Sequence, residues 1–332
     1  MDILVIPTTD WTGHPVPNRL NFIFDRLAEK HKVDVFHFKL FDNKSRDTKC
    51  GLIEMDKEGG KEISSYYLRN SLKHAKKIVG ISDRYDVIVS SNIIPSFFAN
   101  LQDTPIIFDF MDYLPESASI YYDSPMNIIV KNTADLITRY NLKMAEGIIT
   151  PTIEFKEFLS RYTSVPIRVV PNGVDTSVIK KTDSINIELT YSLEHPVLGY
   201  VGSLEEWIDL DYVIDNFAHI KKRYPRAKLM IIGPSLHTDY SDRLRDKVKS
   251  LYLSDDIIFT GRIPYENLGV YISALDVGLN PRKDLKMNRM TMGSKVLNYL
   301  ACGVPVLSSN MPAIEKKFGE EKGVFTYHNE EE

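Results

Sequence analysis

The chain has 332 residues, of which 43% are hydrophobic and 26% charged, and its formal net charge is −4. This length allows two domains with sizeable cores, and the acidic balance gives no general attraction to nucleic acid, so no nucleic-acid partner is expected. Two cysteines, Cys50 and Cys302, are too few for a disulfide framework or a zinc site, and they fit a reducing, cytoplasmic location.

No targeting or membrane-spanning segment is apparent. Residues 1–7 are too short and too acidic for a signal peptide and are typical of a first strand. No apolar run approaches the ~20 residues that cross a bilayer. We therefore expect a cytoplasmic protein that would work at a membrane only from its inner surface.

Short apolar runs alternate with longer amphipathic stretches in the first half, which is typical of parallel βαβ units. We expect strands at residues 3–6, 33–38, 86–90, 105–110, 147–150 and 168–170, and helices at 18–30, 63–79 and 127–146. The sequence Pro-Asn-Gly-Val-Asp follows at residues 171–175. It favours a turn, because Asn-Gly readily adopts positive φ. The polar stretch after it favours a first domain at 1–175, a linker at 176–196 and a second domain at 197–332.

The alternation restarts in the second half. Strands are expected at residues 197–201, 228–232, 257–260, 276–279, 304–308 and 323–327, and helices at 210–223, 239–251 and 264–274. Three of these strands run into glycine, at Gly202, Gly233 and Gly261. Parallel sheets bind ligands at this edge, although glycine can also serve only to tighten a βα turn. No helix is predicted after the last strand, so the second sheet is expected to be short at its C-terminus.

Residues 292–307 are predicted to form a loop, a short helix that ends at Gly303, and an apolar strand. Gly293, Ser294 and Lys295 stand at the start of that helix. Free amides, the helix dipole and an ammonium would converge there on an anion. The alternative is an ordinary helix capped by Ser294.

These features together resemble the GT-B glycosyltransferases, and most closely the retaining glycosyltransferase family 4. The resemblance rests on residues 171–175, 199–204, 229–234, 259–265 and 274–308. It implies two Rossmann-like α/β domains that face a cleft, with a nucleotide-sugar bound mainly on the second. It also implies transfer to a glycan, glycolipid or glycoprotein acceptor with retention and without a metal or other cofactor, the nucleotide-diphosphate sugar being a co-substrate.

The resemblance places the donor phosphates at Gly293, Ser294 and Lys295, and Gly202 and Ser203 are further candidates for donor binding, but the chain departs from the family's pattern. Ser203 and Ile208 stand where many relatives carry an arginine and a lysine, and Met290 and Asn298 replace two glutamates. Asn298 could still bond a ribose, without the strength that a carboxylate gives. Residues 202–209 resemble a subgroup that also lacks the basic pair.

The basic loop 280–292 is expected to compensate, with Arg282 as the candidate to replace the missing arginine. A charge run can equally be a solvated face. Arg262 could reach the base or the phosphates, or could be a surface turn residue.

On the first domain, Asp112 follows a buried strand and is the candidate to orient or deprotonate the acceptor hydroxyl, although it could also cap the next segment. The loop after the first strand offers Trp11 for stacking on a sugar, Gly13, and His14 for bonding a hydroxyl or phosphate. Basic residues beside Tyr66 and Tyr67 in helix 63–79 could rest on an anionic membrane or a lipid-linked acceptor, but a solvated face is the commoner explanation.

Two other functions remain open. A nucleotide-sugar epimerase of the same architecture would need an acid–base set that the sequence does not offer. A non-catalytic relative that binds a sugar-nucleotide or glycan would explain the missing glutamates. A nicotinamide dehydrogenase is disfavoured because no glycine fingerprint follows either domain's first strand.

Overall fold

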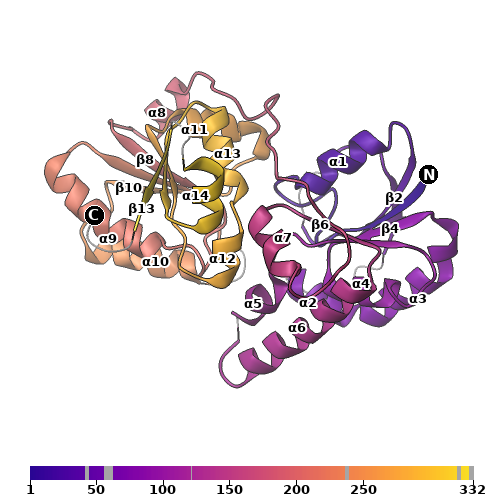
Figure 1. Ribbon diagram of the computed structural model, residues 1–332. Coiled ribbons are helices and arrows are strands. Elements are labelled where there is room, and N and C mark those ends of the chain that lie inside the picture. The colour runs from indigo at the N-terminus through magenta and orange to yellow at the C-terminus, as the bar shows by residue number, and fades with distance from the viewer. Residues whose placement is uncertain (42–44, 56–62, 121, 236–238, 320–322, 329–332) are drawn as a thin grey trace. The chain divides into compact units, whose positions relative to one another are not determined.

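The computed structural model describes residues 1–41, 45–55, 63–120, 122–235, 239–319 and 323–328. The chain divides into two compact units, Met1–Asn172 and Gly173–Glu332. In each unit helices cover both faces of a parallel sheet (Figure 1). Both units are therefore Rossmann-like α/β domains, as the alternation of apolar runs and amphipathic stretches predicts.

The first unit contains a parallel sheet of seven strands in the order β3-β2-β1-β4-β5-β6-β7. Its elements are β1 (Asp2–Ile6), α1 (Arg19–Leu27), β2 (Lys32–His37), β3 (Gly51–Glu54), α2 (Ile63–Arg69), α3 (Ser71–Ile81), η1 (Ser82–Arg84), β4 (Val87–Ser90), α4 (Ile93–Ala99), β5 (Ile106–Asp109), α5 (Leu114–Ser119), α6 (Met126–Met144), β6 (Gly147–Thr150), α7 (Ile153–Leu159) and β7 (Ile167–Val169).

The second unit contains a parallel sheet of six strands in the order β10-β9-β8-β11-β12-β13. Its elements are α8 (Ile185–Thr190), β8 (Val197–Val201), α9 (Leu210–Arg223), β9 (Lys228–Ile232), α10 (Tyr240–Ser250), β10 (Ile257–Gly261), η2 (Tyr265–Asn267), α11 (Leu268–Ser273), β11 (Val277–Asn280), α12 (Lys286–Met290), α13 (Ser294–Ala301), β12 (Val306–Ser309), α14 (Pro312–Phe318) and β13 (Val324–Tyr327).

Strand order reverses once in this second sheet, between β8 and β11. In open parallel sheets the loops at the carboxyl ends of the two strands beside such a reversal diverge and leave room for a ligand. Those loops carry Gly202 and Ser203 on one side and Arg282 on the other. The topology thus positions the predicted donor residues at the edge that this fold uses for binding.

Apolar side chains fill both faces of the second sheet. Along β9, Leu229 and Ile231 pack with α9 and α10, whereas Met230 and Ile232 pack with α11 and α13. This alternation follows from the period of two along a strand. Both faces are buried because βα crossovers place helices on each side.

Two segments differ from the sequence-based expectation. Residues 176–196, predicted as a linker, lie in the second unit, where α8 and the following turn pack Ile187, Tyr191 and Leu193 against its core. The predicted helix 63–79 is two helices, α2 and α3, that meet at Asn70. The Asn70 side chain donates to the carbonyl of Tyr66, a local bond that competes with regular helix.

His74 on α3 is fully buried among Phe36, Phe38, Tyr66 and Tyr67. Its Nε2 lies 3.2 Å from the Tyr66 hydroxyl. These buried rings cannot contact a membrane surface, so Tyr66 and Tyr67 are not available for the membrane contact that the sequence allowed for residues 63–79. Burial lowers the pKa of His74 from 6.5 to about 4.

We expect the free energy of unfolding to depend on this histidine. Between pH 6.5 and 4 the unfolded chain binds a proton at His74 and the folded chain does not, so stability falls as the pH falls, by up to about 3 kcal/mol. Urea titrations of the wild type and His74→Gln at pH 7 and pH 4.5 measure this. The wild type should lose more stability than the variant when the pH is lowered from 7 to 4.5. An equal loss in both proteins would rule the effect out.

Candidate functional site

The three glycines that end strands in the second unit lie side by side. The Gly202 amide donates to the carbonyl of Ile232 at 2.9 Å, and the Gly233 and Gly261 backbones form a bridge. Gly202 and Gly233 have φ of +144° and +137°, and a Cβ on Gly233 would clash with the Gly202 carbonyl. Gly233 is therefore required because the backbone of Gly202 packs against it. Gly202 itself lies against side chains of the candidate site.

The Lys295 amine lies against Gly202. A Cβ on Gly202 would lie 3.4 Å from Nζ of Lys295. The amine donates to the Tyr200 hydroxyl at 3.1 Å and lies 4.5 Å from the centre of the Tyr200 ring. The Tyr200 hydroxyl in turn donates to the Ser203 carbonyl at 2.7 Å. Removal of water around the amine lowers the pKa of Lys295 well below its usual range, and Arg282 lowers it further.

Arg282 is brought to the same place by the loop after β11. Its guanidinium Nη1 donates to Thr291 Oγ1 at 2.6 Å and to Asn288 Oδ1 at 3.2 Å, and only 8% of the residue is exposed. A Cβ on Gly293 would lie 2.5 Å from Nη2. The guanidinium therefore lies against the residue that precedes α13.

The backbone of Arg282 is also fixed next to Ile208, the position at which relatives carry a lysine. Ile208 and Arg282 form an isolated antiparallel bridge, flanked by hydrogen bonds from Asp209 to Pro281 and from Lys283 to Trp207, both 3.2 Å. The arginine thus enters the site from the loop after β11, beside the loop that carries Ser203 and Ile208. That Arg282 compensates for Ser203 and Ile208 stays a prediction.

The start of α13 has no side-chain cap. Gly293 is the N-cap residue, with φ of +74°, and Ser294 is the exposed first residue of the helix. The alternative that Ser294 caps an ordinary helix is therefore wrong. Asn298 follows Ser294 by four residues, so the two lie on the same helix face. The Asn298 side chain is half-buried.

Gly293→Ala is expected to weaken anion binding at this helix start. A methyl group would displace the Arg282 guanidinium and would strain a backbone with positive φ. We expect the dissociation constant for inorganic pyrophosphate to rise at least tenfold, an effect of about 1.4 kcal/mol. Calorimetric titration measures it, with Gly173→Ala, at a glycine with open space around it, as the control. Equal loss in both variants would contradict the assignment.

The remaining predicted donor residue, Arg262, is exposed in the loop after β10. Sequence reasoning also missed four participants: Tyr200, which accepts from Lys295, and Asn288, Thr291 and Ser309, which hold Arg282. Tyrosine inside an apolar strand is indistinguishable from a core residue in the sequence. The structure therefore assembles Gly202, Arg282, Gly293 and Lys295 and adds a neutral shell around them.

At the carboxyl edge of the first unit's sheet, the predicted acid and the buried acid are different residues. Asp112 is exposed beyond the end of β5. Asp109 is fully buried and forms an ion pair with Arg19 at the start of α1, and Arg19 also donates to the Val170 carbonyl. Burial raises the pKa of Asp109 to about 6 against the opposing effect of Arg19. Asp112 alone of the two acids is accessible to an acceptor.

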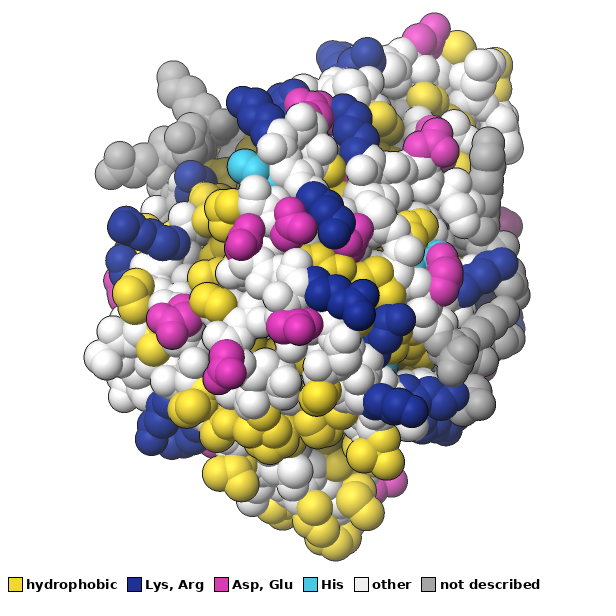
Figure 2. Space-filling model, turned by 90° about the vertical axis from the view of Figure 1, so that its right-hand side faces the viewer, with side chains coloured by type: hydrophobic (Ala, Val, Ile, Leu, Met, Phe, Trp, Pro, Cys, Tyr) yellow, Lys and Arg dark blue, Asp and Glu magenta, His cyan; other side chains and the backbone are white. Residues whose placement is uncertain are grey.

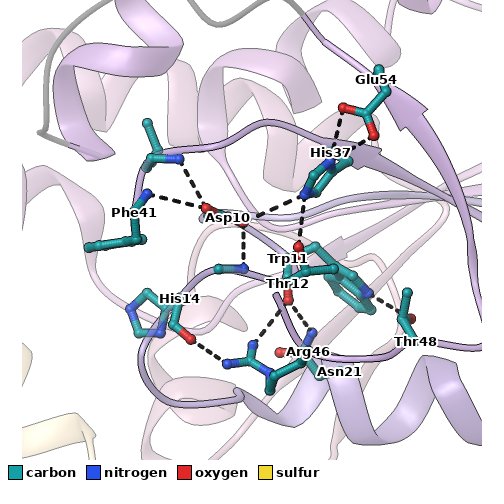
Figure 3. A network of polar contacts seen from close by, with 12 residues as sticks. Asp10, Trp11, Thr12, His14, Asn21, His37, Phe41, Arg46, Thr48 and Glu54 are labelled. Carbon is teal, nitrogen blue, oxygen red and sulfur yellow. Dashed lines mark hydrogen bonds and ion pairs between the residues drawn. The ribbon is translucent and has the colours of Figure 1, made fainter. Parts of the chain in front are cut away.

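The loop after β1 is held by a network of polar contacts (Figure 3). The buried Asp10 carboxylate accepts from the amides of Gly13, Leu40 and Phe41 at 2.8 to 3.3 Å. His37 lies 2.9 Å from the Thr12 hydroxyl and 2.9 Å from the Glu54 carboxylate. These contacts fix the loop from three neighbouring segments.

The side chains predicted for sugar contact occupy different environments in that loop. Trp11 is 2% exposed and packs in the core with its indole N–H donating to Thr48, so it cannot stack on a sugar in this structure. Gly13 is buried against Asp10. His14 is half-buried, its Nδ1 lies 2.7 Å from the Val16 carbonyl, and its ring meets Phe41 edge-on.

Within the residues that the structure describes, no cluster of three or more histidine, cysteine, aspartate or glutamate side chains is arranged to hold a metal ion. None of the helices described has the length and apolarity that crossing a bilayer requires.

Comparison with known proteins agrees with the fold. Residues 183–332 match the family described as glycosyl transferases group 1. The alpha-monoglucosyldiacylglycerol synthase of Streptococcus pneumoniae is 22% identical over 64% of this chain and 48% of its own length. The D-inositol 3-phosphate glycosyltransferase of Acidothermus cellulolyticus is 27% identical over 50% of this chain and 39% of its own. The chain thus spans less than half the length of these curated relatives.

Solved structures match the whole chain. Sucrose-phosphate synthase from Thermosynechococcus elongatus gives a TM-score of 0.77 at 16% identity, covering 100% of this chain and 87% of that one. Anabaena Alr3699/HepE in complex with UDP-glucose gives a TM-score of 0.71 at 15% identity, covering 100% and 86%. The chain therefore has the GT-B fold, and the part of it that matches the glycosyl transferases group 1 model lies in the second unit.

Proposed function

We propose that this protein is a glycosyltransferase that moves a sugar from a nucleotide-diphosphate donor to an acceptor hydroxyl. The observation that carries the proposal is the pair of basic side chains Arg282 and Lys295 beside the uncapped start of α13, at the strand-order reversal of a domain that matches the group 1 model. Helix-start amides and basic side chains are what a diphosphate requires.

The same groups supply the catalytic effect. Breaking the bond between the sugar and the diphosphate leaves negative charge on the leaving oxygen. Donors already aimed at that oxygen, Lys295, Arg282 and the amides of α13, stabilise the charge without reorganising at the moment of reaction. In this proposal they take the place of a metal ion, and transfer proceeds with retention, as the resemblance to family 4 implies.

UDP is the nucleotide to test first, because Anabaena Alr3699/HepE was solved with UDP and with UDP-glucose. Asn298, one turn into α13, is proposed to bond the ribose, and Arg262 the base or phosphates. On the first unit, the exposed Asp112 is proposed to orient or deprotonate an acceptor hydroxyl of a glycan or lipid-linked glycan.

A membrane-surface location is part of the proposal. Helix α6 exposes Met126, Ile128, Ile129, Leu136 and Met144, each at least 49% exposed. Hydrophobic side chains gather at the lower end of the first unit in Figure 2, the end at which α6 lies in Figure 1. The same helix carries three basic residues and one acidic residue, which are Lys131, Arg139 and Lys143 and Asp135. This combination suits an anionic lipid surface on the cytoplasmic side.

Flotation with vesicles tests the membrane location. Wild type is expected to float with vesicles containing phosphatidylglycerol at low salt and to stay in solution with neutral vesicles. Leu136→Glu with Ile129→Glu should abolish flotation without unfolding, since both side chains face solvent. A double variant that floats as well as the wild type would remove α6 from the proposal.

A non-catalytic donor-binding relative is the second candidate, favoured by Met290 and Asn298 where relatives carry glutamates. Calorimetry with UDP, GDP and ADP, followed by assay of nucleotide release from the matching sugar donor, separates the two. Binding with release on an acceptor extract supports transfer. Binding without release on any acceptor supports the second candidate, and absence of binding to all three nucleotides contradicts both.

A further inference from the structure

The Lys295 amine lies in an environment without a counter-ion. Its contacts in the described chain are the Tyr200 hydroxyl and ring face, and no carboxylate oxygen there lies within 4.0 Å of Nζ. A cation held against neutral groups and away from water is destabilised relative to the neutral amine. A neutral amine can make the same hydrogen bond to Tyr200, because it still has N–H donors.

The charged and titratable groups around the amine come from three elements. From β8, Tyr200 uses its only hydroxyl hydrogen on the Ser203 carbonyl and so can only accept from Lys295. Beyond β8, the charge of the buried Glu205 raises the pKa of Tyr200. From the loop after β11, the Arg282 guanidinium disfavours a second positive charge on Lys295. On α13 itself, the Tyr299 hydroxyl is directed at the backbone of the sheet. None of these contacts supplies a negative charge directly to Nζ.

We propose that Lys295 is a neutral amine in the ligand-free protein and takes up one proton when the donor diphosphate occupies the site. This inference rests on the proposed function. The proton comes from solvent and adds to the Nζ lone pair, and no covalent bond to the ligand forms or breaks. The diphosphate supplies the missing counter-ion, so the ammonium becomes the stable form only once the ligand is bound.

Burial and the Arg282 charge both lower the pKa of the free Lys295, which agrees with this geometry. The consequence is that nucleotide binding weakens as the pH rises. In the range between the pKa of Lys295 in the free protein and in the complex, each pH unit costs up to about tenfold in affinity. The terminal phosphate of UDP titrates near pH 6, so measurements above pH 7.5 isolate the lysine.

Calorimetry of UDP binding at pH 8, in buffers of different ionisation enthalpy such as Hepes and Tris, counts the protons exchanged. The wild type is expected to take up close to one proton per UDP bound. Lys295→Arg, whose guanidinium stays charged, is expected to bind UDP with no proton uptake. Zero uptake by the wild type while UDP binds would overturn the inference and leave the proposed function standing.

A ligand-independent measurement covers the case in which no nucleotide binds and the proposed function itself fails. Trace acetylation of all lysines of the ligand-free protein between pH 6 and 10, read by peptide mass spectrometry, reports the fraction of each amine that is neutral. Lys295 is expected to reach its limiting reactivity at a lower pH than the exposed Lys222 on α9. Coincident profiles would overturn the neutral-amine assignment.

Discussion

Lys295→Ala is expected to lower kcat/KM for the sugar donor by about 10²- to 10³-fold, the usual effect of removing one preorganised donor from a developing negative charge. Most of the loss should fall on kcat, because the lysine interacts more strongly with the departing diphosphate than with the intact donor. The side chain contacts Tyr200 and packs beside Gly202, so its removal deletes the amine that would face the diphosphate and leaves the strand ends in place.

Steady-state assay of nucleotide release measures this effect, and Lys222→Ala on the exposed side of α9 is the matched control. Lys295→Arg restores a positive charge and should recover part of the rate. A Lys295→Ala protein that keeps kcat/KM within twofold of the wild type would show that Lys295 does not stabilise the departing diphosphate.

Arg19→Ala is expected to lower the free energy of unfolding of the first unit by about 3–5 kcal/mol, because it leaves the fully buried Asp109 without its cation. The variant also removes a donor from the Val170 carbonyl, which is the C-terminal end of the same sheet. The cost should shrink as the pH falls toward about 6, because Arg19 lowers the pKa of Asp109 and a carboxyl without this cation takes up its proton at a higher pH than in the wild type.

Denaturant titration in a Trp207→Phe background isolates the first unit, since Trp11 then reports alone from its buried position. The double variant Arg19→Met with Asp109→Leu replaces both charges by apolar groups and should recover much of the stability. Arg19→Ala that unfolds at the wild-type denaturant concentration would mean that the pair contributes nothing.

The sequence predicted the fold well where periodicity is long and punctuated. The bounds of β8, β9 and α9 match residues 197–201, 228–232 and 210–223 because glycine or proline borders clear apolar patterns. The edge strand β3 was missed, since its four residues carry little apolar signal. Short helices such as α8 and α12 fall below the length at which helical spacing can be recognised.

The residues of the candidate donor site could be singled out in the sequence because their signals are local. Gly202 ends a strand, and Gly293 and Lys295 open a helix, so each is recognisable within a few residues. The Arg19–Asp109 pair joins positions 90 residues apart and has no local signal. The burial of Trp11 was not predicted, because it depends on contacts with distant residues. Asn21 and Arg46 donate to the Trp11 carbonyl, and Asp10 accepts from the Leu40 amide.

The backbone bridge between Ile208 and Arg282 places the loop after β8 next to the loop after β11. In the proposed function, a basic side chain from the loop after β11 and one from α13 take the place of the basic pair that the resemblance would put in the loop after β8.

A crystal structure of the protein with UDP tests the central claim most directly. We expect the diphosphate to lie at the start of α13, with its oxygens within hydrogen-bond distance of the Ser294 amide and of Nζ of Lys295, and the Arg282 guanidinium beside it. UDP bound elsewhere on the chain, with Lys295 still bonded only to Tyr200, would contradict the assignment of this edge as the donor site.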